Sequence, residues 1–484
     1  MDHIERSVAG HVNRRTARPL SCDMTLDAVT AANRFGLGAR PGELERARDD
    51  ARGWLKKQVT GSRPLPEEIR RLPSSAEIFK TYSALRRERD DAKSDGEAAK
   101  RLLGGLRAKL VPYYLDQVAA RYRVAVATEE SFRERLVHFW TNHFAVSADK
   151  PQVLALAGAL ENEAIRPHVA GRFVDMLTAV EAHPAMILYL DSQASIGPGS
   201  QLAQRRNRRS SDRKLGINEN LAREILELHT LGVDGGYTQQ DVTTFARALT
   251  GWSIGTDRFP GGGELGKFAF HEAAHEPGAK MILGTRYSQS GVAQPRAVLA
   301  DLAKHPATAR HLASKLARHF IADSPPPDAI EHIAKAFRDS AGDLPAVHRA
   351  VLEIPAAWAS PAAKFKTPHE LVVSTFRALD FVPAEPRQVA APFDLLGQRP
   401  YTPGSPAGWP DTATQWDGPD ALLKRIEWAG SVAARVASRE QPLSLGERSL
   451  GVAFNERTRV AIARAASAEQ GITLLFASPE FQRR

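Results

Sequence analysis

Apolar side chains recur at three- and four-residue spacing along most of the chain, and alternation at two-residue spacing is rare. Such spacing puts the apolar side chains on one stripe of an α-helix. The stretches that carry this pattern most clearly are 130–146, 154–163, 173–182, 306–322, 328–340, 344–353, 368–379 and 419–437. The sequence therefore predicts a mainly α protein with a multi-helix, bundle-like architecture.

One segment departs from the helical pattern. Between Gly255 and Arg286 glycine is frequent, and the alternation in KFAFH at 267–271 is typical of a strand. We therefore expect one short strand or hairpin insertion near 255–286. With it, the patterns divide the chain into an N-terminal helical region at 25–125, a central helical core at 126–254, the insertion at 255–290 and a C-terminal helical region at 291–484.

The composition narrows the class of protein. A chain of 484 residues exceeds the size at which a single core usually stops growing, so two or three subdomains are expected. The single cysteine, Cys22, excludes an internal disulfide framework and any metal site built from several cysteines. The net charge of +9 comes from basic residues mixed with acidic ones along the chain. This mixture indicates a weak attraction to anionic partners, and nucleic acid is not expected among them.

No window of the chain approaches the ~20 apolar residues of a membrane-spanning helix. The first 24 residues also lack the apolar region of a signal peptide, and no apolar stretch follows the twin arginine Arg14-Arg15. The sequence thus predicts a soluble, cytoplasmic protein without a transmembrane segment. Export together with a signal-bearing partner is the alternative.

The densest polar group on a helical pattern lies at 217–241, INENLAREILELHTLGVDGGYTQQD. A helix advances about 100° per residue, so Asn220, Glu224 and Glu227 fall within roughly 60° of one another. His229 lies about 160° from Glu227 on the same wheel. Burying so many polar groups costs free energy unless a hydrogen-bond network or a ligand site compensates. We therefore expect this helix to line a polar cleft.

A second polar stripe consists of Glu134, His138 and Asn142, spaced four residues apart in RERLVHFWTNHF. If the two stripes face each other, Glu224, Glu227 and His138 offer oxygen and imidazole ligands that suit Zn, Mn or Fe in a helix bundle. The alternative is that both stripes form interhelix hydrogen bonds and ion pairs with Arg135, Arg223 or Arg247.

The candidate site follows from these stripes. The expected catalytic residues are Glu224, Glu227 and His138, the expected metal ligands are His138, Glu224, Glu227 and His275, and the expected binding residues are Asn142, Asn220, His229 and Arg247. Such a site predicts hydrolysis by a metal-activated water, with an unligated glutamate as the general base. Four further histidines, His311, His319, His332 and His348, read as surface or packing residues of amphipathic helices.

His271-Glu-Ala-Ala-His275 matches the HExxH pattern of zinc peptidases, in which one helical turn separates the two histidines. Pro277-Gly278 follows two residues after His275 and leaves little room for a helix. We therefore expect a loop or strand end here, and a zinc peptidase is the alternative.

Two loops are candidate contact surfaces. The basic stretch at 205–214 has clustered arginines that suit phosphates, membrane headgroups or an acidic partner, although a solvated, flexible loop is the simpler interpretation. The stretch at 397–416 is rich in Pro, Gly and aromatic residues, and irregular loops of this length are uncommon unless they are functional or disordered.

Long phrases of the chain resemble a bacterial family catalogued as domain of unknown function 1800. The matching phrases are HFWTNHFAVS at 138–147, FVDMLTAVEAHPAMILYLD at 173–191, NENLAREILELHTLGVDGGYTQQDV at 218–242, FARALTGW at 245–252, HPATARHLASKLARHF at 305–320, KTPHELVVSTFRAL at 366–379 and SPAGWPD at 405–411. Together with ASPEFQRR at the end, they span nearly the whole chain. Two positions depart from the family pattern, because Glu276 stands where Asp usually follows the histidine and Ser192 where Asn often follows Leu-Asp.

The resemblance implies a mainly helical protein and no settled activity. Members of the family are often encoded beside a second family, domain of unknown function 1501, which resembles sulfatase- and phosphatase-like hydrolases. The resemblance thus adds a second hypothesis to metal-dependent hydrolysis, namely a non-catalytic accessory or assembly partner of such a hydrolase in cell-envelope or polysaccharide processing. The expected partners are the hydrolase itself and an anionic polymer or polysaccharide.

Overall fold

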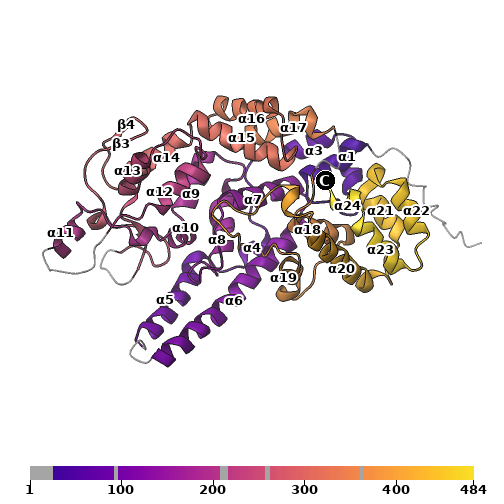
Figure 1. The fold of residues 1–484 in the computed structure, drawn as a ribbon, viewed down its shortest axis with the longest axis horizontal. Coiled ribbons are helices and arrows are strands. Elements are labelled where there is room, and N and C mark those ends of the chain that lie inside the picture. The colour runs from indigo at the N-terminus through magenta and orange to yellow at the C-terminus, as the bar shows by residue number, and fades with distance from the viewer. Residues whose placement is uncertain (1–24, 92–95, 208–215, 257–261, 360–363) are drawn as a thin grey trace, which may run out of the picture.

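The computed structural model describes residues 25–91, 96–207, 216–256, 262–359 and 364–484 (Figure 1). Cys22, the Arg14-Arg15 pair and most of the basic loop lie outside these residues. The described elements are mainly helices with two small sheets, so the mainly α prediction is confirmed. None of the described helices combines the length and the hydropathy of a membrane-spanning segment.

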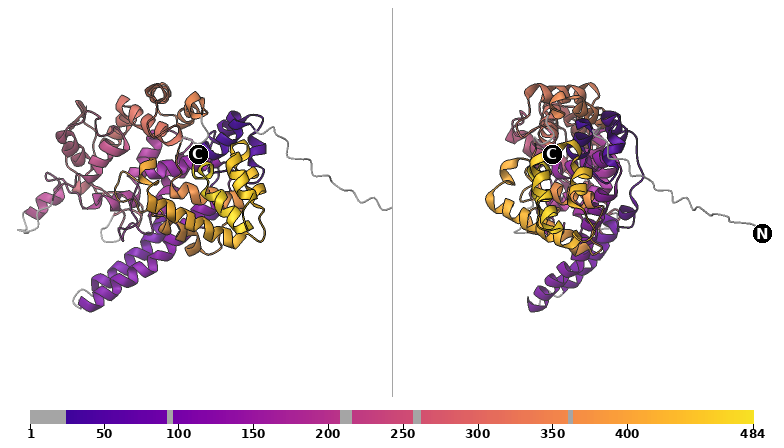
Figure 2. Two further views of the ribbon diagram at one scale, coloured as in Figure 1. Left: turned by 45° about the vertical axis from the view of Figure 1, so that its right-hand side comes forward. Right: turned by 90° about the vertical axis from the view of Figure 1, so that its right-hand side faces the viewer.

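The N-terminal region ends in two long helices that project from the body. Its elements are α1 (Leu26–Thr30), α2 (Glu43–Ala47), α3 (Ala51–Gln58), α4 (Glu67–Arg70), α5 (Ser75–Asp91) and α6 (Gly96–Ala127). Helices α5 and α6 run side by side, and their far ends extend beyond the other helices (Figures 1 and 2). The C-terminal half of α6 returns to the core, where Val118 and Tyr122 are fully buried.

The central region is organised around one buried helix. Its elements are α7 (Ser131–His143), α8 (Ala157–Leu160), α9 (Phe173–Glu181), α10 (Pro184–Tyr189), α11 (Gln201–Asn207), α12 (Asn220–Glu224) and α13 (Gln239–Leu249). Trp140 of α7 is fully buried, and its ring lies 6.2 Å from Phe144 and 5.8 Å from Phe173. Only His138, Thr141 and Asn142 of α7 keep partial exposure, so this helix offers its polar groups along one narrow face.

The predicted insertion near 255–286 is present as two antiparallel pairs of short strands. Strand β1 (Trp252–Ile254) pairs with β2 (Phe268–Phe270), and β3 (Lys280–Ile282) pairs with β4 (Thr285–Tyr287). Between the pairs, HEAAH forms only a 3-10 turn over Glu272–Ala274, with extended backbone at His271 and His275. The zinc-peptidase alternative is therefore wrong here, because the two histidines do not lie on one helix.

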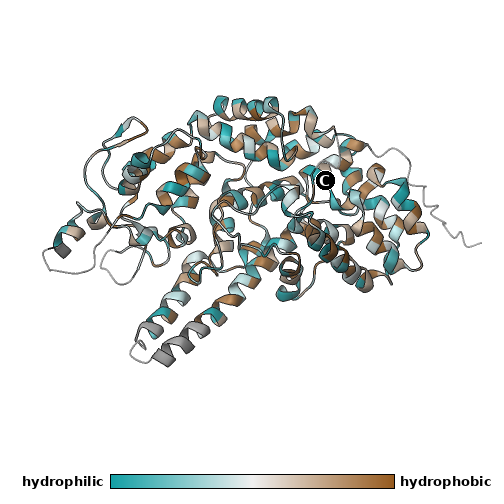
Figure 3. Ribbon diagram, viewed as in Figure 1, coloured by the Kyte–Doolittle hydropathy of each residue, from teal (hydrophilic) through white to brown (hydrophobic). Residues whose placement is uncertain are grey.

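Prolines begin many helices of the C-terminal region, as suits a residue whose missing N–H costs nothing in the first turn. The elements are α14 (Ala293–Leu302), α15 (Pro306–Phe320), α16 (Pro327–Asp339), α17 (Leu344–Glu353), α18 (Pro368–Leu379), α19 (Pro386–Leu395), α20 (Pro419–Val436), α21 (Pro442–Leu450), α22 (Glu456–Ala463), α23 (Ala468–Ala477) and α24 (Pro479–Gln482). The outer helices carry separate hydrophobic and hydrophilic sides (Figure 3), the arrangement that the sequence periodicity predicts.

A short backbone ladder ties the last residues to the segment before α18. Lys364 N donates to Arg484 O at 2.9 Å, and Arg484 N donates to Lys364 O at 2.8 Å. The Arg484 side chain is completely buried, and residues 364–366 beside it are buried as well. The charged groups of Lys364 and Arg484 are thereby fixed beside the cavity described next.

Candidate functional site

A cavity of about 570 Å³ lies where α7, α15, the start of α18 and the aromatic loop 398–412 meet. Its volume falls in the range of small-molecule sites. The polar residues that line it include Arg121, Arg135, His138, Thr141, Asn142, His143, His311, Lys315, Arg318, His319, His369, Glu370, Gln398, Tyr401 and Asp411. Phe139, Phe144, Leu160, Val373 and Trp409 supply much of its apolar wall. The cavity can thus hold an organic molecule with both polar and apolar parts.

Helix α7 supplies one wall and clamps the aromatic loop. Its partly exposed residues His138, Thr141 and Asn142 all line the cavity. Asn142 Nδ2 donates to Trp409 O at 2.9 Å, and Trp409 N donates to Asn142 Oδ1 at 2.7 Å. Gly408 permits this contact, because it has φ +86° and a Cβ there would lie 2.2 Å from Asn142 O. The loop that we expected to be an outward contact surface therefore lines the cavity.

Helix α15 supplies the facing cations. His311, Lys315, Arg318 and His319 follow helical spacing along its cavity side, while Leu312 and Leu316 are buried in the core. Neither Lys315 nor Arg318 has an ion pair or a hydrogen bond to any residue that the structure describes. Burial lowers the pKa of Lys315 to about 8, against an opposing effect of the Asp411 carboxylate. Two cations thus border the cavity without a protein counter-charge in contact.

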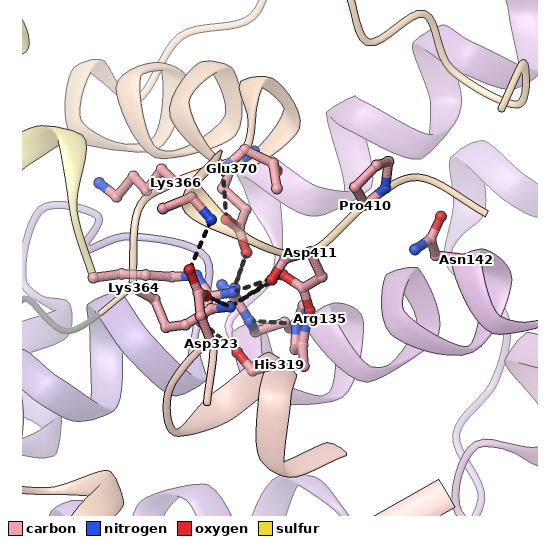
Figure 4. Close-up of polar contacts among 12 residues, drawn as sticks. Arg135, Asn142, His319, Asp323, Lys364, Lys366, Glu370, Pro410 and Asp411 are labelled. Carbon is pink, nitrogen blue, oxygen red and sulfur yellow. Dashed lines mark hydrogen bonds and ion pairs between the residues drawn. The ribbon is translucent and has the colours of Figure 1, made fainter. Parts of the chain in front are cut away.

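In contrast, the carboxylates of the cavity wall form ion pairs or hydrogen bonds with neighbouring side chains (Figure 4). Glu370 pairs with Arg135 and, at 2.8 Å, with Arg484. Burial alone would raise the pKa of Glu370, but these two guanidinium groups hold it well below its usual range. Glu370 also caps its own helix by accepting from Thr367 N at 2.8 Å. Its position therefore follows directly from the capping box that begins α18.

Asp411 is held in the same network. His319 Nδ1 donates to Asp411 Oδ2 at 2.6 Å, and Arg135 Nε donates to His319 Nε2 at 3.2 Å. These contacts assign the hydrogen of a neutral imidazole to Nδ1. Burial lowers the pKa of His319 to about 4, so the ring is neutral near pH 7. Lys364 also donates to the Asp411 carbonyl oxygen at 2.6 Å. Both the carboxylate and the backbone carbonyl oxygen of Asp411 thus accept hydrogen bonds from neighbouring side chains.

The candidate metal cluster among the described residues consists of Glu134, His138 and Glu161, whose ligand atoms all lie within 4.8 Å of one another. Arg166 NH2 donates to Glu134 at 2.9 Å, and Arg121 pairs with Glu161 at 2.6 Å. Burial would raise the pKa of Glu134, but Arg166 and His138 keep it well below its usual value. A divalent cation here would face two guanidinium groups, so this cluster has the form of an ion-pair network.

The polar helix at 217–241 lies outside the lining of this cavity, and its backbone departs from the regular α-helix that a helical wheel assumes. After α12 the chain widens into a π turn over Ile225–His229, so the spacing of 100° per residue no longer applies. His229 Nδ1 donates to Glu181 at 2.7 Å, and Tyr237 donates to Glu227 at 3.2 Å. Burial raises the pKa of Glu224.

The remaining expected residues also lie outside the lining of the cavity. Asn220 is exposed at the start of α12, where its N–H donates to Asn218 at 2.9 Å. His275 Nδ1 donates to the Thr250 carbonyl oxygen at 2.9 Å. Arg247 lies on α13 outside the cavity lining. Of the expected site residues the cavity thus contains His138 and Asn142, and the described residues show no metal-ligand group made of His138, Glu224, Glu227 and His275.

Sequence reasoning missed Lys315, Arg318 and Asp411. The spacing of His311, Lys315 and His319 at four-residue intervals was a usable signal for one polar face. Taken one at a time, His311 and His319 indicate only packing, and the shared face emerges when Lys315 is counted with them.

Comparison with known proteins adds one finding. The sequence profile of the family described as protein of unknown function (DUF1800) matches residues 30–483. No curated protein and no solved structure matches the chain. The chemistry of the site therefore has to be argued from its own geometry.

Proposed function

The chain belongs to the DUF1800 family of proteins of unknown function, and we propose that it binds a small organic anion in the cavity between α7, α15 and the loop 398–412. One observation carries the proposal, which is that Lys315 and Arg318 line the cavity without a partner among the described residues. The wall carboxylates have cations of their own, Arg484 beside Glu370 and Lys364 and Arg484 beside Asp411. A partly buried cation without a counter-charge costs free energy, and a bound anion offsets that cost.

The other residues that line the cavity indicate which further groups the ligand carries. The aromatic rings of Phe139, Phe144 and Trp409 offer apolar contact. His143 donates through Nε2 to the His229 carbonyl oxygen at 3.2 Å, which leaves Nδ1 as an acceptor without a partner among the described residues. A hydroxyl group on the ligand would satisfy that buried nitrogen if the ring turned toward the cavity. A hydroxylated carboxylate or sulfate ester, such as the end of an acidic polysaccharide, combines these features.

Calorimetric titration with matched ligands tests the proposal. The probes are glucuronate and glucose 6-sulfate, with glucose as the neutral control. We expect both anions to bind and to raise the melting temperature, because a ligand at 100 times its Kd stabilises the folded state by about 2.7 kcal/mol. Lys315→Ala and Arg318→Ala should each weaken binding, whereas Lys335→Ala, on the exposed side of α16, should not. Equal affinity for glucose, or unchanged affinity in Lys315→Ala, would refute the proposal.

Metal-dependent hydrolysis has weaker support from the geometry, because Arg121 and Arg166 hold the carboxylates of the Glu134 cluster. Metal analysis of the purified protein checks this argument. We expect no stoichiometric Zn, Mn or Fe. A metal that is present at one equivalent and is lost in His138→Ala would restore the hydrolase hypothesis.

An accessory role beside a hydrolase is the second candidate function. It is favoured by α20, which exposes Leu422, Leu423 and Ile426 within about one turn of its surface. Contiguous exposed apolar side chains mark protein contacts. Co-purification with a co-expressed hydrolase of the domain of unknown function 1501 family tests the role. Leu423→Asp should abolish the complex while anion binding persists, and a complex that survives this change would count against α20 as the contact.

A further inference from the structure

Lys315 lies in the middle of α15 with its amine in the cavity. The titratable and charged groups around it are His311 and Arg318 on its own helix, His143 on α7 and Asp411 on the aromatic loop. Asp411 makes its close contacts with His319, Lys364 and Arg484 instead. The amine therefore has space and lacks a fixed carboxylate partner among the described residues.

A base lies in the same cavity. The side chain of His143 is 1% exposed, and its Nε2–H donates to the His229 carbonyl oxygen at 3.2 Å. Burial, together with the nearby Lys315 charge, keeps the pKa of His143 well below its usual value, so the ring is neutral. Its Nδ1 has a free lone pair and no partner among the described residues. Lys315 and His143 thus line the same cavity, and the buried Nδ1 of His143 has no partner among the described residues.

Desolvation and a neighbouring cation are the two conditions that turn a lysine into a nucleophile. Lys315 meets both, through its burial and through Arg318, and its pKa is lowered to about 8. Roughly one chain in ten then carries the neutral amine at pH 7. Lys315 differs from a lysine that only binds an anion, because it lines the same cavity as the neutral His143.

We propose that Lys315 forms an imine with the carbonyl group of an oxo acid, whose carboxylate is held by Arg318 and whose proton transfer is served by His143. This inference rests on the anion site proposed above and names its substrate class, a small carboxylic acid that carries an aldehyde or ketone.

The step balances without an oxidant or a reductant. The neutral Nζ of Lys315 adds to the carbonyl carbon, so that a C–N bond forms and the π electrons move to oxygen. One nitrogen proton passes through Nδ1 of His143 to that oxygen and gives the carbinolamine. The second nitrogen proton and the hydroxyl group then leave as water while the C=N bond forms.

Reductive trapping tests the inference on the full chain. The probe is 4-formylbenzoate with sodium cyanoborohydride, read by intact mass and peptide mapping, with benzaldehyde as the neutral control. We expect one adduct per chain at Lys315, formed at least ten times faster than with benzaldehyde. Arg318→Gln should remove this preference. The labelling rate at Lys315 should rise with pH through about 8, whereas that of surface lysines should rise through about 10.4.

Lys315→Arg separates this inference from the anion site. The arginine keeps the positive charge, so glucuronate binding should persist while the adduct disappears, and Lys335→Arg should keep both. Binding of the anion by the wild-type chain with labelling spread evenly over surface lysines would overturn the imine and leave the anion site standing. If Lys315→Arg fails to fold, as judged by circular dichroism, the pH profile of the wild-type chain decides, and a midpoint near 10.4 overturns the inference.

Discussion

Replacing Gly408 with alanine should open the cavity by displacing the aromatic loop. Gly408 has φ +86°, and a Cβ there would lie 2.2 Å from the backbone oxygen of Asn142 and 2.8 Å from its Oδ1. The first contact involves backbone, so the loop itself has to move. That movement separates Trp409 from Asn142, whose two hydrogen bonds are 2.9 and 2.7 Å long.

The magnitude can be worked out because the chain offers a matched control. Gly397 has φ +80° and open space around its Cβ position, so Gly397→Ala carries the left-handed backbone cost alone, about 1 to 2 kcal/mol. Gly408→Ala carries the same cost and also loses two hydrogen bonds of about 1 kcal/mol each. We expect it to lower the free energy of unfolding by about 3 to 4 kcal/mol.

Urea unfolding, followed by tryptophan fluorescence, measures the two variants, and hydrogen exchange locates the change. Exchange at 398–412 should speed up in Gly408→Ala and stay close to wild type in Gly397→Ala. Glucuronate binding should weaken only in Gly408→Ala. Equal destabilisation by the two substitutions, with equal exchange in the loop, would refute the assignment of Asn142 as the clamp.

Three further predictions concern the charged groups. Arg166→Met should cost about 3 to 5 kcal/mol in urea unfolding because it leaves the buried Glu134 without its arginine partner, and adding Glu134→Gln should recover part of the loss. Burial lowers the pKa of His348 to about 3, so the unfolded chain binds more protons than the folded protein below about pH 6.5. The free energy of unfolding should therefore fall as the pH drops from 6.5 towards 4, with a smaller slope in His348→Gln. Lys315→Met should raise the free energy of unfolding by about 1 kcal/mol, because it removes a buried cation without a partner, and should abolish anion binding in calorimetry.

The sequence predicted helices correctly where capping residues and first-turn prolines began a stretch with helical apolar spacing. The bounds of α17 and α18 match the expected stretches 344–353 and 368–379, because a capping residue and a first-turn proline begin each of them. Helix α13 likewise begins with a capping box formed by Thr238 and Asp241. Helix α19 was missed, since its interior Pro392 reads as a helix breaker.

The site was harder to predict because its residues are defined by tertiary contacts. The face shared by Glu134, His138 and Asn142 was predicted by helical spacing. The alternative anticipated ion pairs, but with Arg135, Arg223 or Arg247, whereas the arginine that pairs with Glu134 is Arg166. The partner of Asn142 lies 267 residues away in the sequence, and no local pattern indicates such a contact. The absence of a counter-charge at Lys315 is likewise a property of the assembled cavity.

A crystal structure of the protein soaked with glucuronate tests the central claim most directly. We predict density for one molecule in the cavity, with its carboxylate within 3.5 Å of both Lys315 Nζ and the Arg318 guanidinium group. A cavity that holds only water at saturating glucuronate, or a ligand bound away from these two cations, would contradict the proposed anion site.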